Sequence, residues 1–128
     1  MTAHLPLLKE FVENALKQHE SIRYVGVVDM TGTLLCVQMR SKLLPLLTDI
    51  ENEEYARHAI SRHKNRIKFD SKTGGLEYAI VKYEKVIRGM IPITDEIYLL
   101  IAFDIEENEF DYIIMKKIAP LIERYRLR

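Results

Sequence analysis

Hydrophobic side chains recur with the helical period in the first half of the chain. From residue 5 to about residue 18, apolar positions fall three or four apart with charged residues opposite them, which predicts an amphipathic helix. Thr48 and Glu51 match a capping box and predict a second helix that runs to about residue 63. We expect its inward side to carry Ile50, Ala56, Ala59 and Ile60.

A third helical pattern occupies the end of the chain. It is predicted to begin at an Asn108 N-cap with Asp111 in its first turn, and its apolar side continues to Tyr125. Pro120 interrupts this pattern. Because proline has no N–H to donate to the carbonyl of Lys116, we expect a kink or a break at this point.

Shorter apolar runs, separated by turn residues, predict five strands. Residues 22–30 and 33–39 flank Thr31-Gly32 and should form a hairpin. Short turns also join the next three runs, which predicts a meander of residues 76–83, 86–92 and 97–104. The last run is apolar at seven consecutive positions, so we expect a central strand with helices on both faces of the sheet. Residues 66–69 are interpreted as a short extended piece or a loop.

These elements together predict an α+β fold built on one central antiparallel sheet. Hairpin turns connect most of the strands, so parallel crossover units are not needed. When the fifth strand is placed between the first strand and the meander, the strand order becomes 2-1-5-4-3. With 128 residues and no linker-like segment, the chain is interpreted as a single domain, residues 1–128.

The stretch YVGVVDMTGTLLCV has two interpretations. An apolar strand that runs into D-x-T-G-T-L is typical of phosphoryl-transfer sites, which would make Asp29 the nucleophile of a Mg²⁺-dependent enzyme. Such a site needs further carboxylates at the ends of later parallel strands, and the later strands are joined by turns too short for parallel crossovers. The other interpretation is turn chemistry, in which Asp29 and Thr31 bond nearby backbone and Gly32 supplies a positive φ. We favour the turn.

Charge and composition narrow the class of partner. The chain has 19 basic and 19 acidic residues, and this balance argues against a general binder of nucleic acid or anionic membrane. Basic residues gather between positions 57 and 68 and acidic residues between positions 104 and 111, as solvated faces or as docking surfaces. No apolar run approaches the roughly 18 residues of a membrane span, and the N-terminus lacks a secretory signal pattern. We therefore expect a cytoplasmic protein without membrane insertion.

The sequence contains no pattern typical of a metal or cofactor site. His58 and His63 lie five residues apart, on different sides of a helix, so we expect solvated or partner-facing side chains rather than zinc ligands. Cys36 lies within a predicted strand and is expected to be a buried, unreactive thiol. The Gly74-Gly75 pair lacks the Lys and the Ser or Thr of a phosphate-binding loop, and no cofactor is predicted.

Three successive segments carry a resemblance to a known family. VGVVDMTGTLLCVQ, the capped helix after it, and GGLEYAIVKYEKVIRGMIPITDEIYLLIAFD resemble the roadblock and dynein light chain family, whose fold is similar to that of profilins and longins. The resemblance rests on the order of the elements and covers about residues 3 to 126. The segments 41–48 and 62–72 depart from the family pattern.

The resemblance implies a non-enzymatic scaffold that forms homodimers and binds or regulates small Ras-like GTPases or docks onto larger complexes. In that family, the middle helix and a neighbouring edge strand commonly form the dimer. Carried over, the interface candidates are Tyr55, Ala59, Arg62 and His63 on the helix and Tyr78, Ile80 and Lys82 on the strand. An open strand edge is a pairing surface on physical grounds as well, although Lys82 and Lys85 equally fit charges that discourage pairing.

Two other classes of function stay open at this point. An antiparallel sheet with helical cover also builds sensory domains of the PAS kind, which would hold a small molecule between sheet and helices. The phosphoryl-transfer interpretation of Asp29 ranks third, because the rest of the chain does not supply its partners.

Overall fold

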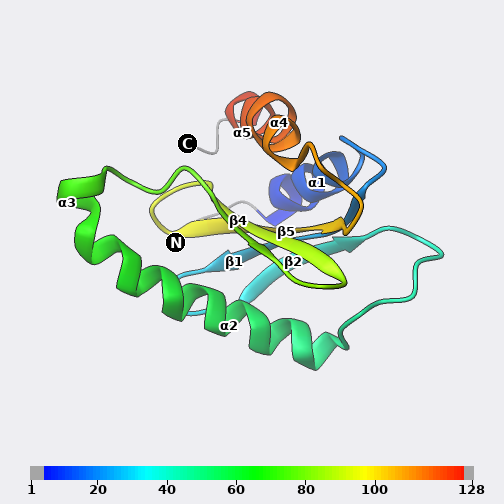
Figure 1. Ribbon diagram of the computed structural model, residues 1–128, viewed down its shortest axis with the longest axis horizontal. Coiled ribbons are helices and arrows are strands. Elements are labelled where there is room, and N and C mark those ends of the chain that lie inside the picture. The colour runs from blue at the N-terminus through cyan, green and yellow to red at the C-terminus, as the bar shows by residue number, and fades with distance from the viewer. Residues whose placement is uncertain (1–4, 126–128) are drawn as a thin grey trace.

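A five-stranded antiparallel sheet forms the middle layer of the molecule (Figure 1). The computed structural model describes residues 5–125. The strands are β1 (Ile22–Asp29), β2 (Leu34–Met39), β3 (Ala79–Lys82), β4 (Val86–Pro92) and β5 (Ile97–Asp104). They lie in the order β2-β1-β5-β4-β3, and each neighbouring pair is antiparallel. The predicted fold class and strand order are confirmed.

β5 occupies the centre of the sheet because it has no polar face. Its first seven residues are all buried, as the uninterrupted apolar run predicts. Ile101 of β5 pairs with Val25 of β1 on one side and with Gly89 of β4 on the other. Helices cover both faces of this strand, so the predicted layering is also confirmed (Figure 1).

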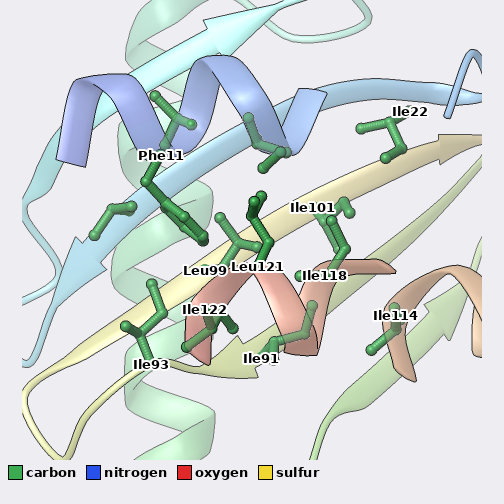
Figure 2. Close-up of a cluster of buried hydrophobic side chains, with 14 of the residues drawn as sticks. Phe11, Ile22, Ile91, Ile93, Leu99, Ile101, Ile114, Ile118, Leu121 and Ile122 are labelled. Carbon is green, nitrogen blue, oxygen red and sulfur yellow. The ribbon is translucent and has the colours of Figure 1, made fainter. Parts of the chain in front are cut away.

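The larger hydrophobic core lies between the sheet and the layer formed by α1 (Leu5–Leu16) and the C-terminal helical segment (Figures 1 and 2). Aliphatic side chains dominate this core, and Phe11 of α1 reaches into it. The residues labelled in Figure 2 are Phe11, Ile22, Ile91, Ile93, Leu99, Ile101, Ile114, Ile118, Leu121 and Ile122. This face of the sheet is therefore closed by close apolar packing.

The C-terminal segment is helical throughout but changes its winding. It consists of α4 (Phe110–Ile113), the π-helical segment η2 (Ile114–Ile118) and α5 (Ala119–Arg124). Pro120 lies in the first turn of α5, directly after the wider π turn. The expected disturbance therefore takes the form of a π turn, because the missing N–H of proline leaves no α-type bond to make there. Asn108 is not the N-cap as predicted, since Glu109 occupies that position without a side-chain cap.

The other face of the sheet is covered by α2 (Asp49–Arg66) alone (Figure 1). Its start is as predicted, because Thr48 and Glu51 form both bonds of the capping box. The prediction that Ile50 faces inward was wrong: it is 74% exposed, and Asn52 is buried instead. The predicted Ala56 is buried as expected.

The segment after α2 stays helical. Residues 67–69 form the 3₁₀ segment η1 (Ile67–Phe69), and α3 (Asp70–Thr73) follows it directly. The expectation of an extended piece or a loop at residues 66–69 was wrong, because α2 continues to Arg66 and the chain then tightens into the 3₁₀ turn.

The turn between β1 and β2 has the bonding that the favoured interpretation of its sequence predicts. One carboxylate oxygen of Asp29 accepts hydrogen bonds from the backbone N–H groups of Thr31, at 2.8 Å, and Thr33, at 3.1 Å. It also accepts from the Thr31 hydroxyl at 2.5 Å. Partial burial acts to raise the pKa of Asp29, but these hydrogen bonds outweigh it and lower the pKa. The carboxylate thus holds the turn together, as the favoured interpretation predicted.

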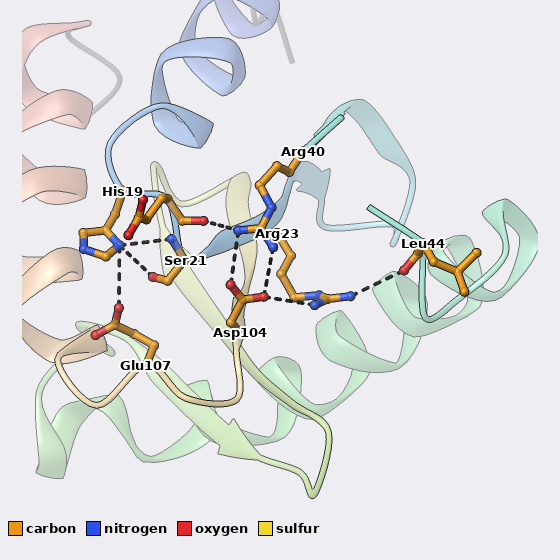
Figure 3. A network of polar contacts seen from close by, with 8 residues as sticks. His19, Ser21, Arg23, Arg40, Leu44, Asp104 and Glu107 are labelled. Carbon is orange, nitrogen blue, oxygen red and sulfur yellow. Dashed lines mark hydrogen bonds and ion pairs between the residues drawn. The ribbon is translucent and has the colours of Figure 1, made fainter. Parts of the chain in front are cut away.

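At the opposite end of the sheet, a polar network ties three strand ends together (Figure 3). Asp104 of β5 forms ion pairs at 3.0 Å with Arg23 of β1 and with Arg40, which directly follows β2. Beside it, Nδ1 of His19 lies 2.8 Å from the Ser21 hydroxyl.

Among residues 5–125, no helix is long and apolar enough to cross a membrane.

Candidate functional site

β3 is an edge strand of the sheet and is shorter than predicted. It spans four residues rather than the expected 76–83, so Tyr78 lies just before it. The N–H of Tyr83 donates to the carbonyl of Val86, which identifies the hydrogen-bonded positions of the β3–β4 ladder. Because such positions alternate in antiparallel pairs, the backbone groups of Ile80 and Lys82 face the open edge. The edge therefore offers backbone donors and acceptors to another strand.

A small cleft lies beside this edge, between the second half of α2 and the β3–β4 hairpin. Its volume is about 20 Å³, which is room for a water molecule or a group of similar size. We call it the arginine cleft, because three of the side chains that line it are arginines, and no acidic residue is among them. The residues that define it are Tyr55, Ala59, Arg62, Arg66, Ala79, Val81, Arg88, Gly89, Met90 and Leu100.

Arg88 of β4 is the most unusual side chain in the cleft. Only 8% of its surface is exposed, and within residues 5–125 it forms no ion pair. Its guanidinium carbon lies 3.9 Å from the centre of the Tyr55 ring and 5.4 Å from that of Tyr24. The Nε atom is buried without a hydrogen-bond partner. Two aromatic rings thus hold the cation, but nothing in the described chain neutralises it.

Burial changes the protonation chemistry around Arg88. It lowers the pKa of Arg88 itself, since a charged group is disfavoured away from water. It raises the pKa of Tyr24 to about 12, and the Tyr24 hydroxyl is also buried without a partner. Burial and the neighbouring Tyr83 raise the pKa of Tyr55 as well. At neutral pH the two tyrosines that flank Arg88 are therefore neutral, and the guanidinium of Arg88 is the charge that lies between them.

The structure brings only some of the predicted interface residues together. Tyr55, Ala59 and Arg62 line the arginine cleft, although Ala59 is itself buried under α2. Tyr78 and Ile80 pack against the larger core, on the face of the sheet away from α2. Tyr78 also donates a hydrogen bond to Asp111.

Lys82 shares the parity of Tyr78 and Ile80, because side chains two apart on a strand point to the same face. Its side chain is exposed. The strand candidates and the helix candidates therefore lie on opposite faces of the sheet, and it is the backbone edge of β3 that belongs to the same region as the cleft.

The sequence pattern predicted that His63 would point to solvent or to a partner. Its side chain is buried instead. It is 3% exposed, and its ring centre lies 4.6 Å from that of Tyr98 beneath α2. The Nδ1 atom has no hydrogen-bond partner. Burial and the nearby Arg66 lower the pKa of His63. The prediction was wrong because the stripe of α2 that packs on the sheet continues one turn further than the pattern suggested.

Sequence reasoning missed Arg66, Val81 and Arg88 as members of this region. One signal for Arg88 was present, since it is the single charged residue in the otherwise apolar run VIRGMIP. The side chain of Val81 lies on the face of the sheet that α2 covers. The predicted strand candidates alternate with it and therefore lie on the other face. Arg66 was missed because the helix was predicted to end before it.

The structure also has further hollows and a free thiol outside the arginine cleft. A second hollow under α2, lined by Arg23, Tyr24 and Arg88 among others, has a volume of about 30 Å³. A larger one of about 440 Å³ lies between the start of α2 and the β1–β2 hairpin. Cys36 is half-buried rather than buried, and burial raises the pKa of its thiol. Within residues 5–125, no three His, Cys, Asp or Glu side chains are grouped to hold a metal ion.

Comparison with known proteins identifies the fold. No family model and no curated protein matches the sequence. The gliding protein MglB of Thermus thermophilus is similar in structure, with a TM-score of 0.76, 13% identity, and coverage of 98% of this chain and 92% of that one. A Roadblock/LC7 domain of Streptomyces avermitilis matches with a TM-score of 0.72, 10% identity and coverage of 92% and 93%.

A profilin of Acanthamoeba castellanii, profilin IA, is similar at a TM-score of 0.55, with 11% identity and coverage of 91% of this chain and 97% of that one. At such identities the similarity concerns the fold. The chain therefore has the roadblock fold, related to that of profilins, as its sequence resemblance predicted.

Proposed function

We propose that this protein is a non-enzymatic, homodimeric interaction module that works in the cytoplasm and binds or regulates a small Ras-like GTPase, or docks onto a larger complex. The observation that carries the proposal is the open edge of β3 beside the arginine cleft. The edge offers the backbone groups of Ile80 and Lys82, and the cleft offers side chains of α2 and β4.

The open edge supports pairing with a second copy of the chain. Adding a strand to an edge satisfies backbone groups that otherwise bond only water, and it extends the sheet across the interface. The edge is short, because β3 has only four residues, and the exposed Lys82 places a charge on it. Both features discourage pairing with unrelated strands, so we expect a specific partner. A symmetric pair of such edges forms a closed dimer rather than a filament.

The two hollows around Arg88 favour a protein partner over a small molecule there, whereas the hollow of about 440 Å³ beside the β1–β2 hairpin is within the size range of a small-molecule pocket. The two beneath α2 measure about 20 and 30 Å³, far below the several hundred Å³ typical of a small-molecule pocket. The opposite face of the sheet is filled by the larger core. The Asp29 carboxylate is engaged in its own turn, which also weighs against the phosphoryl-transfer alternative.

The test is the mass in solution, measured by light scattering over a concentration series. For a chain of 15.0 kDa we expect about twice that mass. Lys82→Pro should shift the protein to monomer, because proline cannot donate a hydrogen bond from the edge. The same change removes no bond to β4, since the N–H of Lys82 points away from it.

Lys82→Ala is the matched control, because it removes the charge and keeps the backbone donor. It should remain a dimer. If the unmodified protein is a monomer throughout the series, the proposal is wrong. If Lys82→Pro stays a dimer, the dimer exists but does not use this edge. A pulldown with the dimer and nucleotide-loaded small GTPases then tests the second half of the proposal.

A further inference from the structure

The second edge strand of the sheet, β2, carries no charge. It lies at the opposite end of the strand order from β3 and has six residues, LLCVQM, where β3 has four. Edge strands usually carry charges or prolines that discourage pairing, and β2 has neither. It is therefore a surface to which another strand could be added.

The backbone groups at this edge belong to Val37 and Met39. The N–H of Arg40 donates to the carbonyl of Arg23 at 3.0 Å, which identifies a hydrogen-bonded position of the β1–β2 ladder. Because such positions alternate in antiparallel pairs, the N–H and C=O groups of Val37 and Met39 point away from β1. Their side chains lie on the face of the sheet that α2 covers.

The same two side chains line the hollow of about 440 Å³ between the start of α2 and the β1–β2 hairpin. We call it the hairpin hollow. The residues that define it are Tyr24, Thr31, Gly32, Thr33, Leu34, Val37, Met39, Asp49, Asn52, Glu53 and Arg57. Val37 is 40% exposed, so the apolar side of the hollow is accessible from the edge of β2.

Two carboxylates without ion pairs border the hairpin hollow. Asp49 and Glu53 lie four residues apart on one flank of α2, and both are exposed. Within residues 5–125 neither forms an ion pair, although Arg57 follows four residues later. The border therefore has two negative charges and one positive charge, which favours a cation in the hollow.

A buried hydroxyl without a partner lies on the sheet side of the hollow. A Cβ added at Gly26 would lie 2.8 Å from the Tyr24 hydroxyl oxygen, so this oxygen lies over Gly26, which pairs with Val37. Tyr24 is 5% exposed, and its hydroxyl has no hydrogen-bond partner. It adds an unsatisfied acceptor to the two carboxylates of the hollow.

We propose that β2 and the hairpin hollow together bind an extended segment of a partner protein, which pairs with β2 and places a lysine or arginine side chain in the hollow. The main chain of the segment bonds the open backbone groups of Val37 and Met39. The aliphatic stem of the basic side chain lies along Leu34 and Val37, and its charged end reaches Asp49 and Glu53. The backbone bonds supply affinity, and the basic side chain selects the segment.

The segment belongs to a different protein rather than to a second copy of this chain. The proposed homodimer uses the β3 edge at the other end of the sheet, and self-pairing at β2 as well would join dimers into an open filament. A small cation would enter the hollow but would leave the backbone groups of β2 unpaired. The inference goes beyond the proposed dimer, and each can fail without the other.

A selected peptide is the probe for this site. A phage-displayed library of random peptides is selected on the immobilised protein, and the strongest binder is synthesised with a fluorescent label for anisotropy measurements. We expect the selected peptides to carry a lysine or arginine among β-branched or aromatic residues, which favour strands. A library from which no such peptide is enriched would overturn the proposal.

Glu53→Gln should raise the dissociation constant of the peptide about threefold to fivefold, because it removes one exposed ion pair. Glu54→Gln is the matched control and should leave the constant nearly unchanged. It removes the same charge one residue later, about 160° around the helix from the buried Ala56, on the side that faces solvent. Equal effects of the two changes would overturn the assignment of the hollow.

A double-mutant cycle assigns the partner of Glu53. When glutamine replaces the basic residue of the peptide, Glu53→Gln should have little further effect, because the two changes remove one interaction. Additive effects would contradict the assignment.

Val37→Pro tests the strand pairing. It should weaken peptide binding at least about tenfold, because proline has no donor and its ring obstructs an added strand. No bond to β1 is lost, since the N–H of Val37 points away from it. Val37→Ala keeps the donor and should bind within about threefold of the unmodified protein. Circular dichroism confirms that each variant is folded, and Met39→Pro replaces Val37→Pro if the latter is not.

Two further outcomes separate the alternatives. Acetyl-arginine amide, which has the basic side chain but no strand, should compete at least about a hundredfold more weakly than the peptide, and equal competition would replace the strand site by a small-cation pocket. Lys82→Pro should leave peptide binding within about twofold, because β2 and β3 lie at opposite ends of the sheet. A monomeric protein whose peptide binding depends on Glu53 keeps this inference and removes the proposed dimer. A dimer that selects no peptide does the reverse.

Discussion

Gly32 is required at its position by two independent constraints. Its φ of +84° lies in the left-handed region, where side chains are rarely found. A Cβ added there would also lie 2.9 Å from the Cα of Arg57, so the turn packs directly on the backbone of α2. Gly74 shares the first constraint, with φ of +80°, but has nothing within 4 Å of an added Cβ. The pair separates backbone strain from steric clash.

Gly32→Ala should lower the free energy of unfolding by several kcal/mol, whereas Gly74→Ala should lower it by only about 1–2 kcal/mol. Both changes strain the backbone, but only Gly32→Ala forces α2 away from the hairpin. Urea denaturation of the two variants measures the difference. Equal losses would show that the contact with Arg57 relaxes freely.

Single residues also mark the limit of what the sequence predicts. The turn chemistry of Asp29 is local, so its role could be read from the residues beside it. The environment of Arg88 is not local, because Tyr24 and Tyr55 come from distant parts of the chain. A charged residue inside an apolar run signals that something is special there. Which groups surround it depends on the register of the sheet and the position of α2.

Among the elements, three strands depend on one carboxylate at their ends. Asp104 accepts hydrogen bonds from Arg40 and Arg23, which fixes the ends of β1 and β2 to the end of β5 (Figure 3). Partial burial acts to raise the pKa of Asp104, but the two arginines outweigh it and hold the pKa below its usual value of 3.8. The folded state thus favours the ionised form more strongly than the unfolded state does.

Asp104→Asn should reduce the free energy of unfolding by about 1–3 kcal/mol at neutral pH. The contribution is present above the unfolded pKa and is lost as the pH falls through the lowered folded pKa, so the two proteins should converge below pH 3.8. Urea denaturation at a series of pH values measures this. Asp95→Asn, in an exposed turn, is the control and should change the free energy of unfolding by less than about 0.5 kcal/mol.

Element boundaries explain most of the differences between the predicted and the observed positions of the interface candidates. The strand that begins the meander was predicted three residues too early, which made Tyr78 a strand residue. Tyr78 instead contacts Asp111 from a position before β3. In α2, the sequence pattern placed Ile50 inward, whereas the side of the helix that meets the sheet contains Asn52 and His63. Small shifts in phase change which side chain faces a neighbour, and a single sequence constrains phase weakly.

At the scale of the whole molecule, the arrangement of layers was predictable. The seven apolar positions of β5 required cover on both faces, and short turns required antiparallel neighbours. Together they fix the strand order without reference to any side-chain contact. The arginine cleft was not predictable in this way, because it forms where three elements meet. Whether the chain acts as a single domain and as a dimer stays a prediction.

The two sides of the sheet differ in how well their polar atoms are satisfied. In residues 5–125, the buried side-chain atoms without hydrogen-bond partners belong to Tyr24, His63 and Arg88, and all lie on the α2 side. The side of α1 and α5 is apolar throughout its cluster. We expect local unfolding to begin on the side with the unsatisfied polar atoms, so backbone amides of α2 should exchange hydrogen with solvent before those of β5. A partner bound to α2 would slow that exchange. Hydrogen exchange in this helix would therefore report both its local stability and the binding of a partner.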